Sequence, residues 1–368
     1  MTSERKTTAA AHDDVVVVGV GARTAIGLDM RMTADSVAAG LKRFREVSYL
    51  RDRTDGHPIV MSLLTSLSED TFAVARMEQL ARSAAREALA PLGDAVRADG
   101  QMAIPVLLSV PPKRPGFSDA DMTALAKSVM QGLGIHLDRG RCGLQGTGAE
   151  AAIGALAQAA QLLRDSKVPA VLVGGVESYK DIDTLQWIDG TERLKRPGRP
   201  NGITPGEGAG FLLLCRADLA RERGWQPLAR LLAVGHGSEP HPWYSGQAHM
   251  AEGLTQAVQA AFAEPETENL AVTSVWSDLN GEAWRAEEWS YTYLRSVTHH
   301  PEPMNLLHPA DCWGDLGAAS GATLAALAAY QLHHDPHPAA SSLVWCASAQ
   351  SPYRAACVLG KWVEDAAA

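Results

Sequence analysis

The feature that most constrains the fold of this chain is a repeated alternation between short apolar runs and longer helical patterns. Residues 14–22, DVVVVGVGA, form an uninterrupted apolar run that ends in glycines, and residues 103–110, AIPVLLSV, form another. Runs of this length without polar alternation indicate strands that are buried on both faces. Strands that alternate with helices in this way predict α/β layers.

The same pattern runs through the whole chain and divides it into two halves. The predicted strands are residues 14–22, 103–110, 169–175, 211–215, 228–237, 271–278, 342–348 and 354–360. The predicted helices are residues 31–42, 69–91, 118–133, 149–165, 248–263, 282–296 and 316–333. The alternation begins again near residue 228, which suggests a duplicated unit with one half at 13–216 and the other at 217–368. Residues 1–12 are polar and predict a disordered tail, and residues 178–205, rich in Arg, Lys, Pro and Gly, predict a long surface loop.

The composition argues against several classes of protein. The 368 residues carry a net charge of −9 without a basic patch, which argues against nucleic-acid binding. No run approaches roughly 18 apolar residues, so a membrane span is not expected, and the polar N-terminus does not resemble a signal peptide. The five cysteines are scattered and include no CxxC pair, which fits a reducing compartment without structural zinc. We therefore expect a cytoplasmic protein.

Three segments resemble the β-ketoacyl synthase family of the thiolase superfamily. They are VVVVGVGARTAIGLD at 15–29, AVLVGGVES at 170–178 and RPNGITPGEGAGFLLL at 199–214, of which the GEGAG core at 206–210 is the most specific. The likeness covers the N-terminal half well and the C-terminal half at two weaker motifs. It implies the thiolase fold, in which two similar α/β halves form five layers (α-β-α-β-α), and it implies a dimer.

The resemblance implies a catalytic cysteine on a sharp turn at the N-terminus of a buried helix, where the helix dipole favours its thiolate. In GLQGTGAEAAIGALA at 143–157, the threonine of that motif falls on Thr147 and the cysteine position falls on Ala149. A shifted alignment would place Gly148 or Gln145 there instead, and no shift of a few residues supplies a cysteine. Without this nucleophile, an acyl-enzyme cannot form by the family's route.

The resemblance also implies two catalytic histidines and a lysine in the C-terminal half, and all three have changed. Asp278 and Asp315 fall at the histidine positions, and Ala310 falls at the lysine position. Residues 348–352, SAQSP, replace the glycine-rich C-terminal loop of the family. These coordinated changes indicate a diverged member of the family, for which Claisen condensation is not expected.

Asp278 and Asp315 are the candidate catalytic residues that remain. Because the two histidines of the family face one cavity, we expect the two carboxylates to lie close together and partly desolvated, so that one could hold a proton near neutral pH. With Glu282 they could alternatively bind a hard cation, or each could simply cap a helix or a turn. The resemblance further implies that a set of residues lines this cavity: Thr147, Gly148, Ile203, Glu207, Asn280 and Glu282. For Glu207 the alternative is a structural hydrogen-bond acceptor.

Other charged or ring-bearing side chains have less specific patterns. Trp284, Arg285 and Glu288 fall within one helical turn, where a solvated face with i,i+3 pairing is more ordinary than the mouth of a cavity. Residues 333–337, HHDPH, could suggest a metal site, but histidines near a helix C-terminus that is followed by proline are the simpler explanation. The GVGARTAIG segment lacks the glycine spacing of a dinucleotide fingerprint. Neither a metal nor a cofactor is therefore expected.

One local basic cluster lies in the predicted surface loop at 178–205. Its members are Arg193, Lys195, Arg196 and Arg199. This cluster could contact the acidic surface of an acyl carrier protein or the phosphate of a pantetheine arm, and it could equally be a solvated part of the loop.

Three functions remain open from the sequence. The first is a non-condensing homologue in fatty-acid or polyketide-type metabolism, which binds acyl groups or carrier proteins, or pairs as a homodimer or as a heterodimer with an active ketosynthase. The second is an enzyme that uses Asp278 and Asp315 on an acyl-type substrate such as an acyl-CoA, and the third is a residual acyltransferase. A partner subunit predicts a filled cavity, whereas a re-tooled enzyme predicts an open cavity, carboxylates exposed to it and at least one raised pKa.

Overall fold

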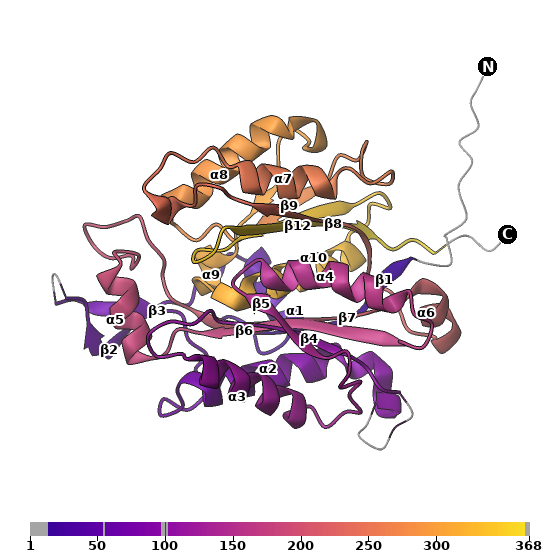
Figure 1. The fold of residues 1–368 in the computed structure, drawn as a ribbon, viewed down its shortest axis with the longest axis horizontal. Helices are drawn as coiled ribbons and strands as arrows, with labels where there is room; N and C mark the ends of the chain where they lie inside the picture. The colour runs from indigo at the N-terminus through magenta and orange to yellow at the C-terminus, as the bar shows by residue number, and fades with distance from the viewer. Residues whose placement is uncertain (1–13, 54–55, 97–99, 101, 365–368) are drawn as a thin grey trace.

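The computed structural model describes residues 14–53, 56–96, 100 and 102–364, so the tail predicted at 1–12 lies outside the described residues. The elements lie in five layers: outer helices, a sheet, central helices, a second sheet and outer helices (Figure 1). This α-β-α-β-α order is the thiolase fold that the sequence predicts.

The first sheet comes from the N-terminal part of the chain. Its strands are β1 (Val15–Thr24), β4 (Val106–Val110), β5 (Gly143–Thr147), β6 (Ala170–Ser178) and β7 (Glu207–Arg216). The helices of this part are α1 (Met30–Ala38), α2 (Ala73–Ala88), α3 (Asp119–Gly132), α4 (Ala151–Leu163), α5 (Ile182–Gly190) and α6 (Ala217–Arg223). In the order β1-β7-β6-β4-β5, strand β4 pairs in parallel with β5 and β6, and β7 runs antiparallel to β1 and β6. Helices α2 and α3 cover the outer face, and β5 is left at the edge.

The second sheet comes from the C-terminal part of the chain and repeats this plan. Its strands are β8 (Ala229–Ser238), β9 (Ser274–Ser277), β10 (Leu306–Leu307), β11 (Ser341–Ala347) and β12 (Tyr353–Lys361). The helices of this part are α7 (Glu252–Ala261), α8 (Ala283–Arg295), α9 (Ala310–Trp313) and α10 (Ser320–His334). Strand β9 pairs in parallel with β10 and β11, and β12 runs antiparallel to β11 and β8. Strands β1 and β8 pair over two residues each, which links the two sheets by hydrogen bonds.

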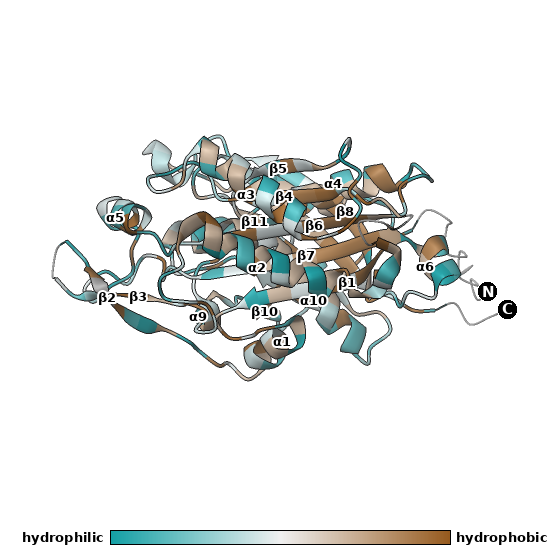
Figure 2. Cartoon of the chain, turned by 90° about the horizontal axis from the view of Figure 1, so that it is seen from below, coloured by the Kyte–Doolittle hydropathy of each residue, from teal (hydrophilic) through white to brown (hydrophobic). Residues whose placement is uncertain are grey.

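Helices α4 and α10 form the central layer because both are rich in alanine and apolar around most of their surface. Their small side chains let both sheets approach closely, and they share one buried core with the inner faces of the strands. The N–H of Gly321 on α10 donates to the carbonyl oxygen of Ala149 at 3.1 Å. A Cβ at residue 321 would lie 2.5 Å from that oxygen, so glycine is required there. In the hydropathy view, strands β1, β6 and β7 are mostly hydrophobic, whereas the outer helix α2 carries hydrophilic residues (Figure 2).

Most predicted elements are present within a few residues of the expected bounds. The helix predicted at 118–133 is α3, and it begins with a capping box in which Ser118 and Asp121 bond to each other's backbone N–H groups. The helix predicted at 69–91 is α2, which is shorter than expected and ends at Ala88.

The prediction of a surface loop over residues 178–205 is wrong for its first half. This segment contains α5, which begins where the Asp181 side chain accepts a hydrogen bond from the Thr184 N–H. Leu185 and Ile188 of α5 pack in an apolar cluster with the hairpin of β2 (Arg45–Arg51) and β3 (Pro58–Met61). The hairpin and α5 protrude together at one end of the molecule (Figure 1).

Candidate functional site

The turn between β5 and α4 presents Ala149 at the start of the central helix. Gly148 adopts a φ of +124°, and a Cβ there would lie 2.7 Å from the Glu150 carboxylate and 2.8 Å from the Ser348 hydroxyl. Ala149 is 6% exposed and packs with the core of the central layer. The turn is therefore kept in place while it presents only a methyl group, which can neither attack a carbonyl group nor transfer a proton.

Glu150, next to Ala149, is a buried carboxyl group that sequence reasoning missed. It is 6% exposed, and its Oε2 atom has no hydrogen-bond partner among the described residues. Burial raises its pKa to about 8, against the opposing effects of its own backbone N–H and of Arg354. Glu150 is therefore mostly protonated at neutral pH. Its place one residue after Ala149, where the resemblance implies the nucleophile, was the only sequence signal that could have identified it.

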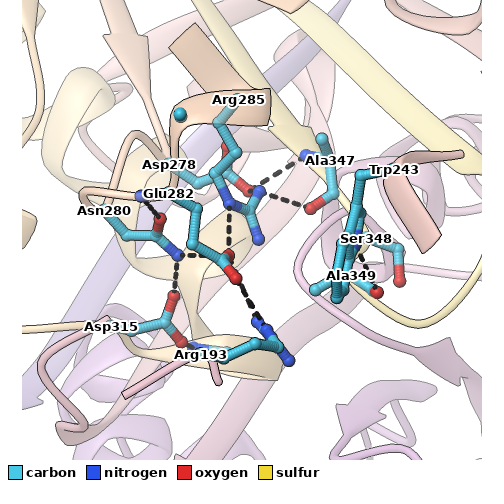
Figure 3. A network of polar contacts seen from close by, with 12 residues as sticks. Arg193, Trp243, Asp278, Asn280, Glu282, Arg285, Asp315, Ala347, Ser348 and Ala349 are labelled. Carbon is cyan, nitrogen blue, oxygen red and sulfur yellow. Dashed lines mark hydrogen bonds and ion pairs between the residues drawn. The ribbon is translucent and has the colours of Figure 1, made fainter. Parts of the chain in front are cut away.

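Asp278 follows β9 and is held by α8 and β11. Its Oδ2 atom accepts hydrogen bonds from Arg285 Nη1 at 2.5 Å and from the Ala347 N–H at 2.9 Å (Figure 3). Arg285 Nη1 also donates to the Ala347 carbonyl at 2.5 Å. Burial raises the pKa of Asp278 to about 6, helped by the charge of Asp315 and opposed by Arg285. The carboxyl group is thus an ion-pair partner that titrates near neutral pH.

Asp315 lies between α9 and α10, and donors satisfy both of its oxygens. Its Oδ1 atom accepts from the Tyr179 hydroxyl at 2.7 Å and from the Gly317 N–H at 2.8 Å. Its Oδ2 atom accepts from Asn280 Nδ2 (Figure 3). Burial and the negative charge of Asp315 raise the pKa of Tyr179 well above its usual value, so the tyrosine remains a donor.

Glu282 links the hydrogen-bond partner of Asp315, which is Asn280, to the ion-pair partner of Asp278, which is Arg285. It accepts two hydrogen bonds from Arg193, at 2.6 and 3.1 Å, and one from Asn280 Nδ2 at 3.3 Å (Figure 3). Arg285 Nε lies 3.5 Å from the same carboxylate. Burial opposes the ionisation of Glu282, but the two arginines outweigh it and lower its pKa. The result is a continuous buried network of two guanidinium groups and three carboxyl groups.

Two further buried ion pairs flank this network. Arg114 donates to both oxygens of Glu177 at 2.6 and 3.1 Å. Arg354 on β12 donates to both oxygens of Glu288 on α8 at 2.6 and 2.7 Å. Bidentate pairs of this kind fix the positions of both side chains.

These side chains leave very little free space at the site. The cavity beside Ala149 is bordered by Arg114, Arg285 and Ser348, and its volume of ≈ 30 Å³ admits one or two water molecules. A neighbouring cavity of ≈ 10 Å³, lined by Asp278, Asn280 and Asp315 among others, is at the limit for a single water molecule. Neither holds an acyl chain in this conformation.

Only some of the residues that were predicted to line the cavity border a cavity in the structure. The structure brings Asp278 and Asp315 to the wall of one small cavity, where they are 5% and 6% exposed. Gly148 borders the cavity beside Ala149, and Asn280 borders the smaller one. The other predicted lining residues border neither of these two cavities: Thr147, Ile203, Glu207 and Glu282.

Each of these departures has a physical reason. Thr147 lies on the edge strand β5, and Ile203 packs in the apolar cluster beside α5. Glu207 accepts two hydrogen bonds from Arg76 of α2, at 2.5 and 2.6 Å, which is the structural role that was its alternative. Glu282 lies behind Arg193, its ion-pair partner, and Arg193 is the residue that borders the cavity beside Ala149.

The solvated face expected for Trp284, Arg285 and Glu288 is wrong, because all three side chains are buried. They pack between α8 and the second sheet, and Arg285 borders the cavity beside Ala149. The i,i+3 spacing of the sequence did not show that β11 and β12 lie on this face.

Three of the four residues in the predicted basic cluster form ion pairs with different carboxylates. Arg193 is buried against Glu282, so it does not present its charge at the surface as expected. Arg196 pairs with Asp52 at 2.9 Å, and Arg199 pairs with Glu192 at 2.9 Å. Lys195 is exposed.

Two arginines of the protruding hairpin lie on the same side of the molecule as this cluster. The Arg196–Asp52 ion pair joins the hairpin to the loop after α5. Arg51 and Arg53, the neighbours of Asp52, are both exposed. The exposed basic surface therefore combines two segments that are far apart in the sequence.

In the part of the chain that the structure describes, no three His, Cys, Asp or Glu side chains are grouped so that they could hold a metal ion. Within the same residues, no helix is both long and apolar enough to cross a membrane.

No protein-family model matches the sequence, and no curated protein matches it. Solved structures match its fold. An oxazolomycin ketosynthase domain from Streptomyces albus is 15% identical, with a TM-score of 0.72 over 96% of this chain and 75% of that chain. A ketosynthase from module 6 of the bacillaene synthase of Bacillus subtilis is 13% identical, with a TM-score of 0.73 over 95% and 72% of the two chains.

A third similar structure is the ishigamide ketosynthase/chain length factor. It is 19% identical, with a TM-score of 0.69 over 95% of this chain and 100% of that chain. The chain therefore has the fold of the ketosynthases along nearly its whole length. At these identities the likeness concerns the fold and not the chemistry of the site.

Proposed function

We propose that this chain is a non-condensing member of the β-ketoacyl synthase family that acts as a partner subunit of an active ketosynthase. The observation that carries the proposal is the packed site: buried ion pairs fill the space beside Ala149 and leave ≈ 30 Å³. A condensing enzyme needs a nucleophile and room for an acyl chain at this place. A subunit that contributes surface instead needs only a stable fold.

The thiol of Cys346, which interacts with Asp278 and Arg285 of the network, does not favour a residual acyltransferase. Cys346 lies on β11 and is fully buried. Burial and the negative charge of Asp278 raise its pKa well above the usual value. Because the thiolate is the nucleophile, a thiol held in its neutral form is inert.

The free edge of the first sheet supports pairing with a second subunit. Strand β5 is hydrogen-bonded to β4 on one side and ends the order of the sheet on the other. An edge strand presents unpaired N–H and C=O groups that favour pairing with another chain. Leu144 on this strand is 40% exposed, which adds an apolar contact. Pairing through this edge fits either a homodimer or a heterodimer with a ketosynthase.

The basic surface at the protruding hairpin supports a second kind of contact. Arg51, Arg53 and Lys195 are exposed there in a chain with a net charge of −9. One of the similar structures is a type II polyketide synthase acyl-carrier protein in complex with its ketosynthase. We propose that this basic surface, without Arg193, contacts an acidic carrier protein.

A carboxylate enzyme remains the second candidate, because the pKa of Asp278 is raised to about 6. A carboxyl group that titrates near neutral pH can exchange protons with a substrate. Asp278 is 5% exposed, however, so this function also requires the site to open.

The experiment that tests the partner-subunit proposal is affinity purification of the full chain from its source cell at native abundance. We expect a ketosynthase in about equal amount, identified by mass spectrometry, and a complex with the mass of a dimer by light scattering. A chain that purifies as a monomer without a ketosynthase, at concentrations where dimers of this fold persist, would contradict the proposal.

A further inference from the structure

The wall of the cavity beside Ala149 carries three guanidinium groups, those of Arg114, Arg193 and Arg285. All three residues are buried, with exposures of 7%, 7% and 3%. They lie outside the three segments that resemble the ketosynthases, so the resemblance gives them no role. Because a guanidinium group keeps its charge at any pH at which a protein is folded, three permanent positive charges meet at one small cavity.

The carboxylates that balance these charges are unevenly placed around the cavity. Glu177 and Asp315 border it, whereas Asp278 and Glu282, which pair with two of the arginines (Figure 3), do not. The wall thus carries three positive groups against two negative ones, and Coulomb attraction favours an anion there. The two farther carboxylates reduce this attraction, so we expect weak binding.

Hydrogen bonding at the wall favours a ligand that accepts. The Nε atoms of Arg114 and Arg285 are buried and make no hydrogen bond to any described residue, although Arg285 Nε lies 3.5 Å from the Glu282 carboxylate. The two wall carboxylates, in contrast, already accept a hydrogen bond at each of their oxygens. A buried donor without an acceptor is costly, so an acceptor in the cavity would stabilise this wall.

Two neutral groups and a helix terminus add to this preference. The Glu150 Oε2 atom and the Ser348 hydroxyl lie 2.7 and 2.8 Å from the place that a Cβ of Gly148 would occupy, and Gly148 borders the cavity. Burial raises the pKa of Glu150 to about 8, so at neutral pH this group adds a donor and no negative charge. Helix α4 begins at Ala151, and the dipole of its 13 residues favours an anion at this end.

The size of the cavity limits the ligand. A volume of ≈ 30 Å³ holds one or two water molecules and suits only the smallest planar oxyanions. Pro112 and Gln350 border the cavity and are partly exposed, so the cavity lies close to the surface on their side. A planar oxyanion also matches the flat arrangement of guanidinium N–H groups.

We propose that the cavity beside Ala149 binds a small planar oxyanion, of which formate is the smallest carboxylate. Arg114 and Arg285 donate to it through their free Nε–H groups, and the Ser348 hydroxyl donates from the opposite part of the wall. The arginines are already paired, so the Kd is on the order of millimolar. The inference concerns this cavity alone and does not rest on the partner-subunit role.

The test is saturation-transfer NMR of the full chain with sodium formate, because this method detects weak, reversible binding through the formate proton. Sodium gluconate at the same concentration is the matched control, since it is also a carboxylate but is too large for the cavity. We expect a formate signal that saturates, and a rise in Tm with formate that gluconate does not give. A formate signal that does not saturate, or an equal rise in Tm with gluconate, would overturn the proposal.

Two variants assign the signal to this cavity. Ala149→Val adds two methyl groups at the wall and should abolish saturable binding of formate. Ser348→Ala removes one donor and should weaken the Kd roughly threefold to tenfold. Ser341→Ala is the matched control, because Ser341 is a buried serine on β11 that borders neither cavity of the site, and it should leave the Kd unchanged.

Circular dichroism shows which variants fold. An unchanged formate signal in folded Ala149→Val would place the anion elsewhere and overturn the proposal. If Ala149→Val does not fold, Ser348→Ala decides, because equal Kd values in Ser348→Ala and Ser341→Ala would remove the cavity from the binding site.

Discussion

Burial, more than the proximity of like charges, sets the protonation of the carboxyl groups at this site. Desolvation is the largest influence on the pKa of both Glu150 and Asp278, which it raises to about 8 and about 6. Glu282 is buried to a similar degree, yet its pKa is lowered because two arginines face it. Burial therefore prevails at Glu150 and Asp278, whereas the charge and hydrogen bonds of Arg193 prevail at Glu282.

The raised pKa of Glu150 predicts a dependence of stability on pH. Because the folded state binds this proton more tightly than the unfolded chain, its stabilising contribution is complete below about pH 4.5 and is lost as the pH rises to about 8. The loss is about 1.4 kcal/mol for each pH unit within that window. The Glu150→Gln variant should lack this slope in its free energy of unfolding, measured by urea denaturation from pH 5 to pH 9. Glu264→Gln, at an exposed position, is the control, and parallel curves for Glu150→Gln and the native chain would contradict the assignment.

The two aspartates should respond differently to amide substitution. Asp278→Asn removes the closer of the two carboxylates that face the buried Arg285, and breaking a buried pair costs about 3 kcal/mol or more. Asp315→Asn keeps an acceptor for Tyr179 and Gly317 and should cost only about 1 kcal/mol. Chemical denaturation near pH 7.5, where Asp278 is mostly ionised, measures both free energies of unfolding. A larger loss for Asp315→Asn would instead show that its negative charge is essential to the network.

At the scale of elements, the edge strand β5 is the part of the fold most directly tied to the proposed role. Leu144→Arg places a charge on this edge and should weaken association with a second subunit at least tenfold, which is about 1.4 kcal/mol of binding free energy. Leu294→Arg is the matched control, because Leu294 is 70% exposed on the outer helix α8. Sedimentation velocity over a range of concentrations measures the association. Equal behaviour of the two variants would place the interface elsewhere.

The sequence predicted the elements whose pattern is strong and missed those whose pattern is weak. Continuous apolar runs identified β1 and β6 because both faces of these strands are buried. Strand β5 was not predicted, because it has two glycines and one large apolar residue in five positions. Helix α5 was missed although Asp181 caps it, because its nine residues are too few for a clear helical period.

At the scale of the whole molecule, the layers bring together segments that are far apart in the chain, and for this reason much of the site could not be predicted. The family resemblance singled out Ala149, Asp278 and Asp315 as candidate positions. It gave no information on the ion pair of Arg193 with Glu282, which joins positions 89 residues apart. Charge and spacing along one chain do not identify such partners, so Arg193 was expected at the surface.

The packed interior also predicts that restoring the nucleophile alone does not restore condensation. Ala149→Cys supplies a thiol, but Asp278 and Asp315 stand where the resemblance implies histidines, and the cavity has ≈ 30 Å³. Decarboxylation of malonyl-carrier protein, followed as release of carbon dioxide, should stay at the background rate. Release well above that rate in Ala149→Cys would show that the carboxyl groups can replace the histidines.

The measurement that tests the central claim most directly is intact-mass spectrometry of the native chain after incubation with an acyl-CoA and with an acylated carrier protein. The account predicts an unchanged mass, because Ala149 offers no nucleophile and the ion-pair network fills the site. A stable adduct with the mass of the acyl group would contradict it, and mapping that adduct would identify the nucleophile that replaces the missing cysteine.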